Sequence, residues 1–226
     1  MPHAPFTIDD GHLGSLAIFP LETVVLLPHA ILPLHIFEPR YRVMTAHALE
    51  RGTPIAIARV VPGQLDGHGR PVVEPVVGVG RVIQQELQPD GRYNLLLAGV
   101  ERATIEQELD VDTPYRQVRA RRLESTVHEP VVVEHQHRIL RELIFRLRAS
   151  KPAISSVMLR LLDESTSRAA AVDRVCSALT MPVERRYELL AQPVVDERYD
   201  VVVELVAEAV ANAEAPVDDE GGPLLN

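Results

Sequence analysis

The chain has 226 residues, of which 46% are hydrophobic and 24% charged, as is ordinary for a globular protein with a core of its own. Its net charge of -9 argues against nucleic acid as the main partner, because a phosphate backbone would be repelled. The single cysteine, Cys176, excludes an internal disulfide and a cysteine-rich metal site, and we expect it to be a small buried residue.

The amino-terminal residues give no sign of a targeting segment. Residues 1–14 contain no lysine or arginine, so they do not resemble a signal peptide and are predicted to form a flexible leader. An apolar stretch over residues 16–34 is interrupted by a glutamate and three prolines, which rules out a spanning helix there. We therefore expect a cytoplasmic protein without membrane contact.

Up to about Glu124 the residue pattern is typical of β-strands. Short apolar runs with β-branched residues predict strands at residues 16–20 and 23–27. The prolines within residues 28–37 forbid a helix interior and predict extended chain at or around a sheet edge.

One helix is expected to interrupt the strands. Pro39 suits a first helical position and Gly52 suits the position just past the last turn. A strand is predicted over residues 54–61, and the glycine-rich residues 62–70 are predicted to form a loop.

A hairpin is the clearest local prediction. Pro89, Asp90 and Gly91 form a turn sequence between strand-like runs at residues 77–87 and 92–100. Glycines inside these runs, at positions 78, 80 and 99, indicate bulges or sharp bends of the kind that close a small barrel. Two more strands are expected at residues 103–109 and 115–125.

From Pro130 onward the apolar period becomes helical. Helices are predicted at residues 131–150, 154–162 and 167–179, from Pro182, and at residues 194–213. Strands followed by helices define an α+β protein, with an antiparallel barrel-like unit over residues 15–126 and a helical bundle over residues 127–213. The acidic residues 214–226 lack a pattern, so we expect a disordered tail.

Three segments carry a family resemblance. IFPLETVVLLPHAILPLHIFEPRY at residues 18–41, the glycine-rich hairpin at residues 78–105, and VCSALTMPVERRYELLAQPVVDERYDVVVELV at residues 175–206 resemble, in order, the amino-terminal domains of Lon proteases. The variant LHIFEPRY at residues 34–41 is similar to free-standing bacterial members of the family.

The resemblance implies a fold and a role. Its implied fold is a PUA-like pseudo-barrel with one inserted helix, followed by a helical part. Its implied role is recognition of unfolded or tagged protein segments, with a protease or chaperone as a further partner. No GxxxxGK(S/T) segment occurs, and the only lysine, Lys151, lies in a context unlike a protease's Ser–Lys pair. We therefore expect a non-enzymatic module without the motor or protease parts and without a cofactor.

The candidate peptide-binding residues lie at the junction before the predicted helix. Arginine could grip carboxylates and backbone carbonyls, and aromatic rings could receive apolar side chains. The alternative is that the aromatic residues belong to the core and that the glutamate pairs with a nearby arginine. The candidates are His35, Phe37, Glu38, Arg40 and Tyr41.

Two other functions remain open at this point. The arginine-rich strand Arg116–Arg122 could bind RNA, although its alternation also fits a solvated face. A small enzyme could use a cleft between the two halves, but the carboxylates of residues 101–112 show no acid–base pairing pattern. The histidine pairs at residues 29 and 35 and at residues 135 and 137 are too sparse to predict a metal site.

Overall fold

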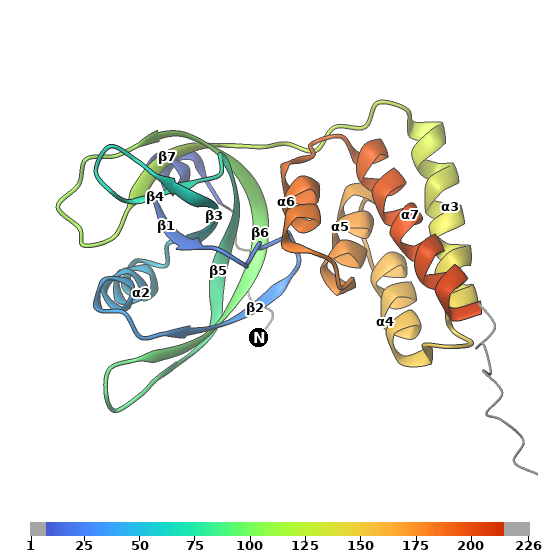
Figure 1. Cartoon of the computed structure of the whole chain (residues 1–226), viewed down its shortest axis with the longest axis horizontal. Helices are drawn as coiled ribbons and strands as arrows, with labels where there is room; N and C mark the ends of the chain where they lie inside the picture. The colour runs from blue at the N-terminus through green and yellow to red at the C-terminus, as the bar shows by residue number, and fades with distance from the viewer. Residues whose placement is uncertain (1–7, 215–226) are drawn as a thin grey trace, which may run out of the picture.

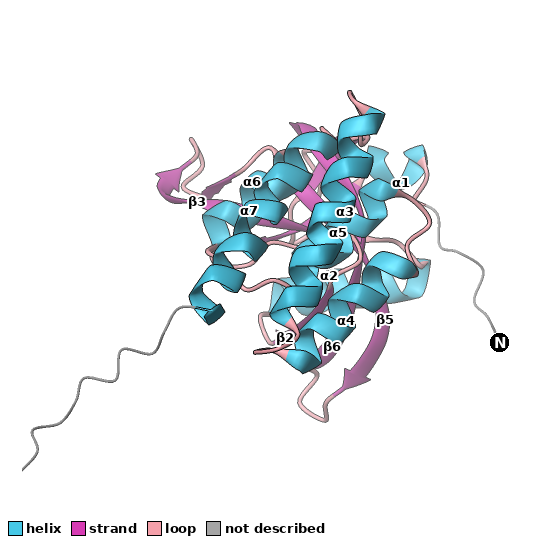
Figure 2. Cartoon of the chain, turned by 90° about the vertical axis from the view of Figure 1, so that its right-hand side faces the viewer, coloured by secondary structure: helices cyan, strands magenta, loops and turns pink. Residues whose placement is uncertain are grey.

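The computed structural model describes residues 8–214 and shows a β lobe followed by a helical lobe (Figure 1). The strands are β1 Leu16–Leu21, β2 Ile31–Ile36, β3 Ile55–Leu65, β4 Pro71–Val73, β5 Val76–Leu87, β6 Tyr93–Glu108 and β7 Gln117–Arg122. The helices are α1 Asp10–Gly14, α2 Pro39–Arg51, α3 Pro130–Leu147, α4 Pro152–Asp163, α5 Arg168–Ala178, α6 Val183–Ala191 and α7 Val195–Glu214. Figure 2 views the molecule from the helical lobe, with strands visible behind the helices.

The β lobe is a closed, mostly antiparallel barrel. Its strands follow the order β1-β7-β6-β5-β3, and a parallel pairing of β1 with β3 completes the circuit. β4 extends β3, and β2 pairs with the first half of β6. The predicted α+β architecture, with α2 inserted among the strands and a bundle after them, is confirmed.

The segment between β1 and β2 was predicted to contain a strand at residues 23–27, and this prediction is wrong. Leu26 and Leu27 are buried, but their carbonyls lie on the face of the β5–β6 sheet instead of at an edge where they could pair. The strand glycines make this possible, since a Cβ at Gly78 would lie 1.8 Å from the Leu26 oxygen and one at Gly99 would lie 2.1 Å from the Leu27 oxygen. The pairing of β5 with β6 also shifts register at Gly80, which confirms the expected bulge.

Two segments that were predicted to lack regular structure contain a helix and the end of a strand. Residues 8–14, expected to belong to a flexible leader, contain α1, and Ile8 and Leu13 are buried in a core of the barrel. Residues 1–7 lie outside the described residues. β3 continues through Leu65 into the predicted loop, because its far half pairs only with the short β4 and so tolerates Pro62 at an edge.

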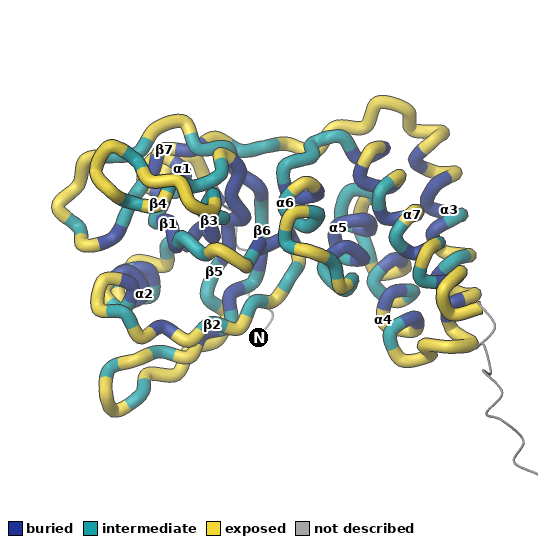
Figure 3. The backbone as a smooth tube through the Cα atoms, in the orientation of Figure 1, coloured by how far each residue is buried: buried dark blue, intermediate teal, exposed yellow. Residues whose placement is uncertain are grey.

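The helical lobe has its own apolar core. α3 packs mainly on α7, and α4 and α5 complete the lobe. Cys176 is buried in this core, as expected, and burial raises the pKa of its thiol to about 12. Figure 3 shows buried positions running through both lobes. The expected tail begins at Glu214, which is the last residue of α7, and residues 215–226 lie outside the described part of the chain.

His137 on α3 contacts Arg168 of α5 and Tyr199 of α7, and these contacts define its protonation state. Its Nε2 lies 3.0 Å from Nη1 of Arg168, which can only donate, so the ring is a neutral acceptor there. Its Nδ1 lies 2.9 Å from the Tyr199 hydroxyl, which in turn donates to the Arg168 carbonyl at 3.2 Å. Burial, followed by the charge of Arg168, lowers the pKa of His137 below its usual 6.5.

This environment predicts a loss of stability in mild acid. The unfolded chain binds a proton at His137 below pH 6.5, whereas the folded chain resists it, so stability falls as the pH drops through this value. We expect His137→Gln to reduce the difference in unfolding free energy between pH 7.5 and pH 5.5, measured by urea titration. His29 also has a lowered pKa, so its contribution should persist in the variant. An unchanged pH dependence in His137→Gln would contradict the prediction.

Candidate functional site

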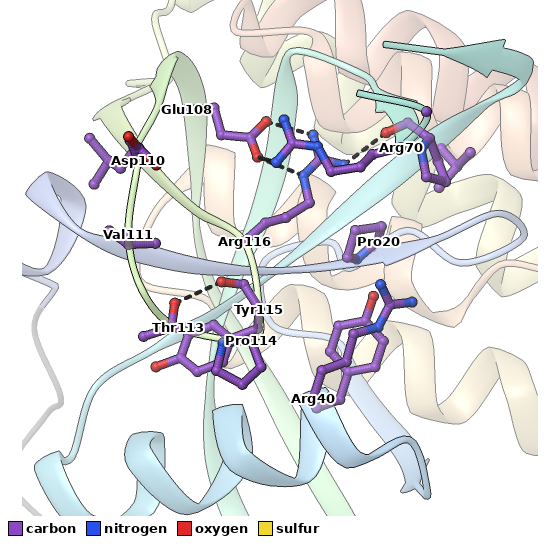
Figure 4. Close-up of a pocket in the computed structure, with 15 residues that line it drawn as sticks. Pro20, Arg40, Arg70, Glu108, Asp110, Val111, Thr113, Pro114, Tyr115 and Arg116 are labelled. Atoms are coloured by element: carbon purple, nitrogen blue, oxygen red, sulfur yellow. Dashed lines mark hydrogen bonds and ion pairs between the residues drawn. The ribbon is translucent and has the colours of Figure 1, made fainter. Parts of the chain in front are cut away.

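A hollow of about 390 Å³ opens at the end of the barrel where α2 begins (Figure 4). One wall is formed by the first turn of α2 and by Pro20 of β1, and the other by the turn before β4 and the loop between β6 and β7. Two of the predicted residues, Arg40 and Tyr41, line it.

The α2 wall presents an arginine on an aromatic support. Pro39 starts the helix, and Glu38 before it holds Arg40 through contacts of 3.0 Å at Nε and 2.9 Å at Nη2. The Arg40 guanidinium lies 4.5 Å from the centre of the Tyr41 ring, within the range of a cation–π interaction. Tyr41 itself is 5% exposed and packs on Phe19 with ring centres 4.4 Å apart. Burial raises the pKa of its hydroxyl, so it stays protonated. Tyr41 is therefore a core residue that supports Arg40.

The opposite wall contains a carboxylate, that of Glu108, which is held by two arginines. Glu108 forms an ion pair with Nη1 of Arg70 at 2.8 Å. It also accepts hydrogen bonds from Nε and Nη2 of Arg116, at 3.0 and 2.8 Å. Arg70 also contacts Asp66, whose pKa is lowered to about 2 by hydrogen bonds, the largest from the Arg70 backbone. All three arginines that line the hollow are paired with carboxylates, Arg40 with Glu38. Arg40 is the most exposed of the three, at 52% against 42% for Arg70 and 15% for Arg116, so it is the arginine best placed to meet a ligand.

His35 and Phe37 lie elsewhere, at β2 and just after it. His35 lines a second hollow, of about 420 Å³, formed by β2, β6 and β5. Its Nδ1 donates to Asn94 Oδ1 at 2.8 Å, and the Asn94 amide donates to Glu86 at 3.2 Å. Phe37 is 60% exposed, and its ring centre is 6.2 Å from that of His35. The structure thus divides the five predicted residues between two neighbouring places.

Sequence reasoning missed the wall opposite Arg40. Arg70, Glu108 and Tyr115 come from segments far apart in the chain and meet only when the barrel closes. Arg116 had been noticed only as a member of an arginine cluster, and Glu108 only as one of several carboxylates at residues 101–112. No local pattern marks these residues as one group.

The arginine-rich strand is largely neutralised by neighbouring carboxylates. Arg116 is clamped to Glu108, and Arg122 contacts Glu101 at 2.7 Å. The outward side chain of Arg121 lies 3.8 Å from Glu106. Carboxylates thus face three of the four arginines, and the exposed Arg119 alone offers little charge to an RNA backbone.

The groove between the lobes contains a buried ion-pair network. Arg102 of β6 donates to both oxygens of Asp173 of α5, at 2.9 and 2.6 Å. Arg198 of α7, fully buried, lies 3.2 Å from the same carboxylate and donates to Ser125 at 2.9 Å. The carboxylate oxygens are committed to two guanidinium groups, so the network holds the lobes together and does not supply a free acid or base. Among residues 8–214, no group of three or more metal-ligating side chains is positioned to hold an ion.

These features define a small barrel carrying a helical bundle, with a mixed polar and apolar hollow where the inserted helix begins. The profile of the ATP-dependent protease La (LON) substrate-binding domain family matches residues 15–208, so the chain belongs to this family. A comparison with curated protein sequences gives no match.

Two solved structures are similar in fold. The Lon N-terminal domain protein from Xanthomonas campestris is 20% identical, with a TM-score of 0.60, over 84% of this chain and 97% of that one. The N-terminal domain of the Mycobacterium avium complex Lon protease is 14% identical, with a TM-score of 0.64, over 86% of this chain and 98% of that one. No helix in the described range 8–214 is both long enough and apolar enough to cross a membrane.

Proposed function

We propose that the chain is a non-catalytic, cytoplasmic module that binds unfolded or tagged segments of other proteins. The family match over residues 15–208 carries this proposal, since the family is defined as a substrate-binding domain. The compensated charges in the barrel hollow and in the groove between the lobes support a role in binding over a role in proton transfer. A separate protease or chaperone would act on the bound protein.

The proposal is tested with a permanently unfolded protein, reduced and carboxymethylated α-lactalbumin, and with the native form of the same protein. We expect the full chain to bind the unfolded form and not the native form, as measured by fluorescence anisotropy. Binding of the unfolded form no tighter than that shown by an unrelated acidic protein would overturn the proposal.

A single substitution in the hollow should weaken this binding without unfolding the protein. Arg40→Ala removes an exposed cation and is expected to lower the affinity by about tenfold, equivalent to about 1.4 kcal/mol. Arg141→Ala is the matched control, because Arg141 is 51% exposed and paired with Asp163 on the helical lobe, much as Arg40 is 52% exposed and paired with Glu38. Equal affinities for the two variants would remove Arg40 from the site.

A further inference from the structure

β2 has one edge without a strand partner. Within residues 8–214 it pairs with β6 over its whole length, from Ile31 opposite Ala98 to Ile36 opposite Tyr93, and with no other strand. Such an edge is a template for pairing with another chain. Figure 1 shows β2 running beside β6 toward α2 at the margin of the β lobe.

The hydrogen bond just before β2 shows which of its backbone groups face β6 and which face the free edge. The Gly99 N–H donates to the Ala30 carbonyl at 2.8 Å, so position 30 faces β6. Backbone groups alternate along an antiparallel strand, so positions 32, 34 and 36 also face β6. Ile31, Pro33 and His35 therefore direct their backbone groups to the free edge. This placement suits Pro33, which has no N–H to give to β6.

The free edge is uncharged and partly apolar. The β2 sequence ILPLHI contains no Lys, Arg, Asp or Glu, although edge strands are commonly protected by such residues. Ile31 is 53% exposed and Phe37, directly after the strand, is 60% exposed. The strand itself offers no charged side chain to pair with a charge on a ligand, so the edge favours an uncharged occupant.

We propose that the free edge of β2 binds an extended, uncharged segment of another protein as an added β-strand. This inference rests on the proposed function and names the mode of binding. The N–H groups of Ile31 and His35 are donors about 13 Å apart, given the rise of a strand, and the missing donor at Pro33 lies midway between them. The carbonyl of the added strand that faces Pro33 finds no backbone donor there, and because Pro33 is exposed, water can donate to it.

Amide hydrogen exchange tests this mode in the unaltered protein. The probe is a blocked hexapeptide of alternating threonine and valine, added to saturation. We expect the Ile31 and His35 amides to exchange at least tenfold more slowly with the probe bound. Leu32 and Leu34, whose N–H groups already face β6, serve as internal controls and should change little. Unchanged exchange at Ile31 and His35 in the saturated complex would overturn the inference.

A pair of substitutions separates backbone pairing from side-chain contact. His35→Pro removes the outward N–H and keeps the pairing with β6, whereas His35→Ala keeps the N–H and removes the ring. Affinity for the hexapeptide should fall at least tenfold in His35→Pro relative to His35→Ala. If His35→Pro fails to fold, Ile31→Pro and Ile31→Ala provide the same comparison at the other donor. Equal affinities within a folded pair would overturn the inference.

The remaining outcomes distinguish this inference from the proposed function. Failure of the unaltered chain to bind unfolded α-lactalbumin overturns the proposed function and this inference with it. Binding of unfolded α-lactalbumin without protection of Ile31 and His35 by either probe overturns the inference alone. Protection that rises with protein concentration in the absence of probe, together with a dimer by light scattering, would assign the edge to a second copy of the chain.

Discussion

Replacing Gly78 by alanine is expected to lower the free energy of unfolding by about 3 kcal/mol or more. The added Cβ would lie 1.8 Å from the Leu26 carbonyl oxygen and 2.8 Å from its carbon. Both atoms belong to backbone that crosses the face of the barrel, and no flexible side chain can move aside. Either this segment or β5 must shift, which would open the core around Leu26. Urea unfolding followed by circular dichroism measures the effect.

The matched control is Gly67→Ala in the turn between β3 and β4. A Cβ at Gly67 meets nothing within 4 Å, so its effect should be within about 0.5 kcal/mol. Equal stability of the two variants would show that the Leu26 carbonyl does not lie against Gly78 of β5. The result therefore tests the placement of a segment that local sequence rules described as a strand.

Replacing Asp173 by alanine is expected to cost about 3–5 kcal/mol of folding stability. The change leaves the guanidinium groups of Arg102 and Arg198 buried together without their shared carboxylate. The side chains of Arg102, Asp173 and Arg198 are 4%, 5% and 0% exposed, and this burial lowers the pKa of Arg198 to about 10. The network spans β6, α5 and α7, so its loss should also loosen the contact between the lobes. Thermal unfolding and the rate of proteolysis between the lobes, at residues 123–129, measure these two effects.

Asp163→Ala provides the comparison for this second prediction. Asp163 also pairs with an arginine, Arg141, but the two side chains are 54% and 51% exposed. Solvent screens such a pair, so its loss should cost less than about 1 kcal/mol. A similar cost for Asp173→Ala and Asp163→Ala would mean that the Arg102–Asp173–Arg198 network is not desolvated as the structure shows.

Neighbouring residues were sufficient to predict the elements whose ends are set by proline, glycine or a helical apolar period. α2 begins at Pro39 and ends before Gly52, which adopts φ 66° as its cap. The hairpin turns at Pro89–Gly91, where Gly91 has φ 80°. The five helices from Pro130 onward lie where their apolar period predicted them, because a helix makes its backbone hydrogen bonds within itself.

Predictions failed where a segment depended on partners distant in the chain. Residues 23–27 have the composition of a strand, but no sheet edge is available to them because they cross a sheet face. The predicted strands at residues 92–100 and 103–109 are one long strand, β6. β6 pairs with β5 along residues 93–104, with β2 along residues 93–98 and with β7 along residues 103–108. The stretch at residues 8–14 is short and polar, and it is fixed by two buried side chains, Ile8 and Leu13.

In the candidate site, too, one part could be predicted from neighbouring residues and the other depended on segments distant in the chain. Arg40 and Tyr41 are adjacent in sequence, so the pattern at the start of α2 could identify one wall of the hollow. The clamp of Arg70 and Arg116 on Glu108 required barrel closure, which brings the β3–β4 turn to the β6–β7 loop. By itself the sequence determined the periodic elements, their turns and the family, because these depend on neighbouring residues and ordered motifs. Only the tertiary structure decided which carboxylate neutralises which arginine, that Tyr41 supports Arg40 from within the core, and that β2 pairs with β6, because each depends on contacts between distant segments.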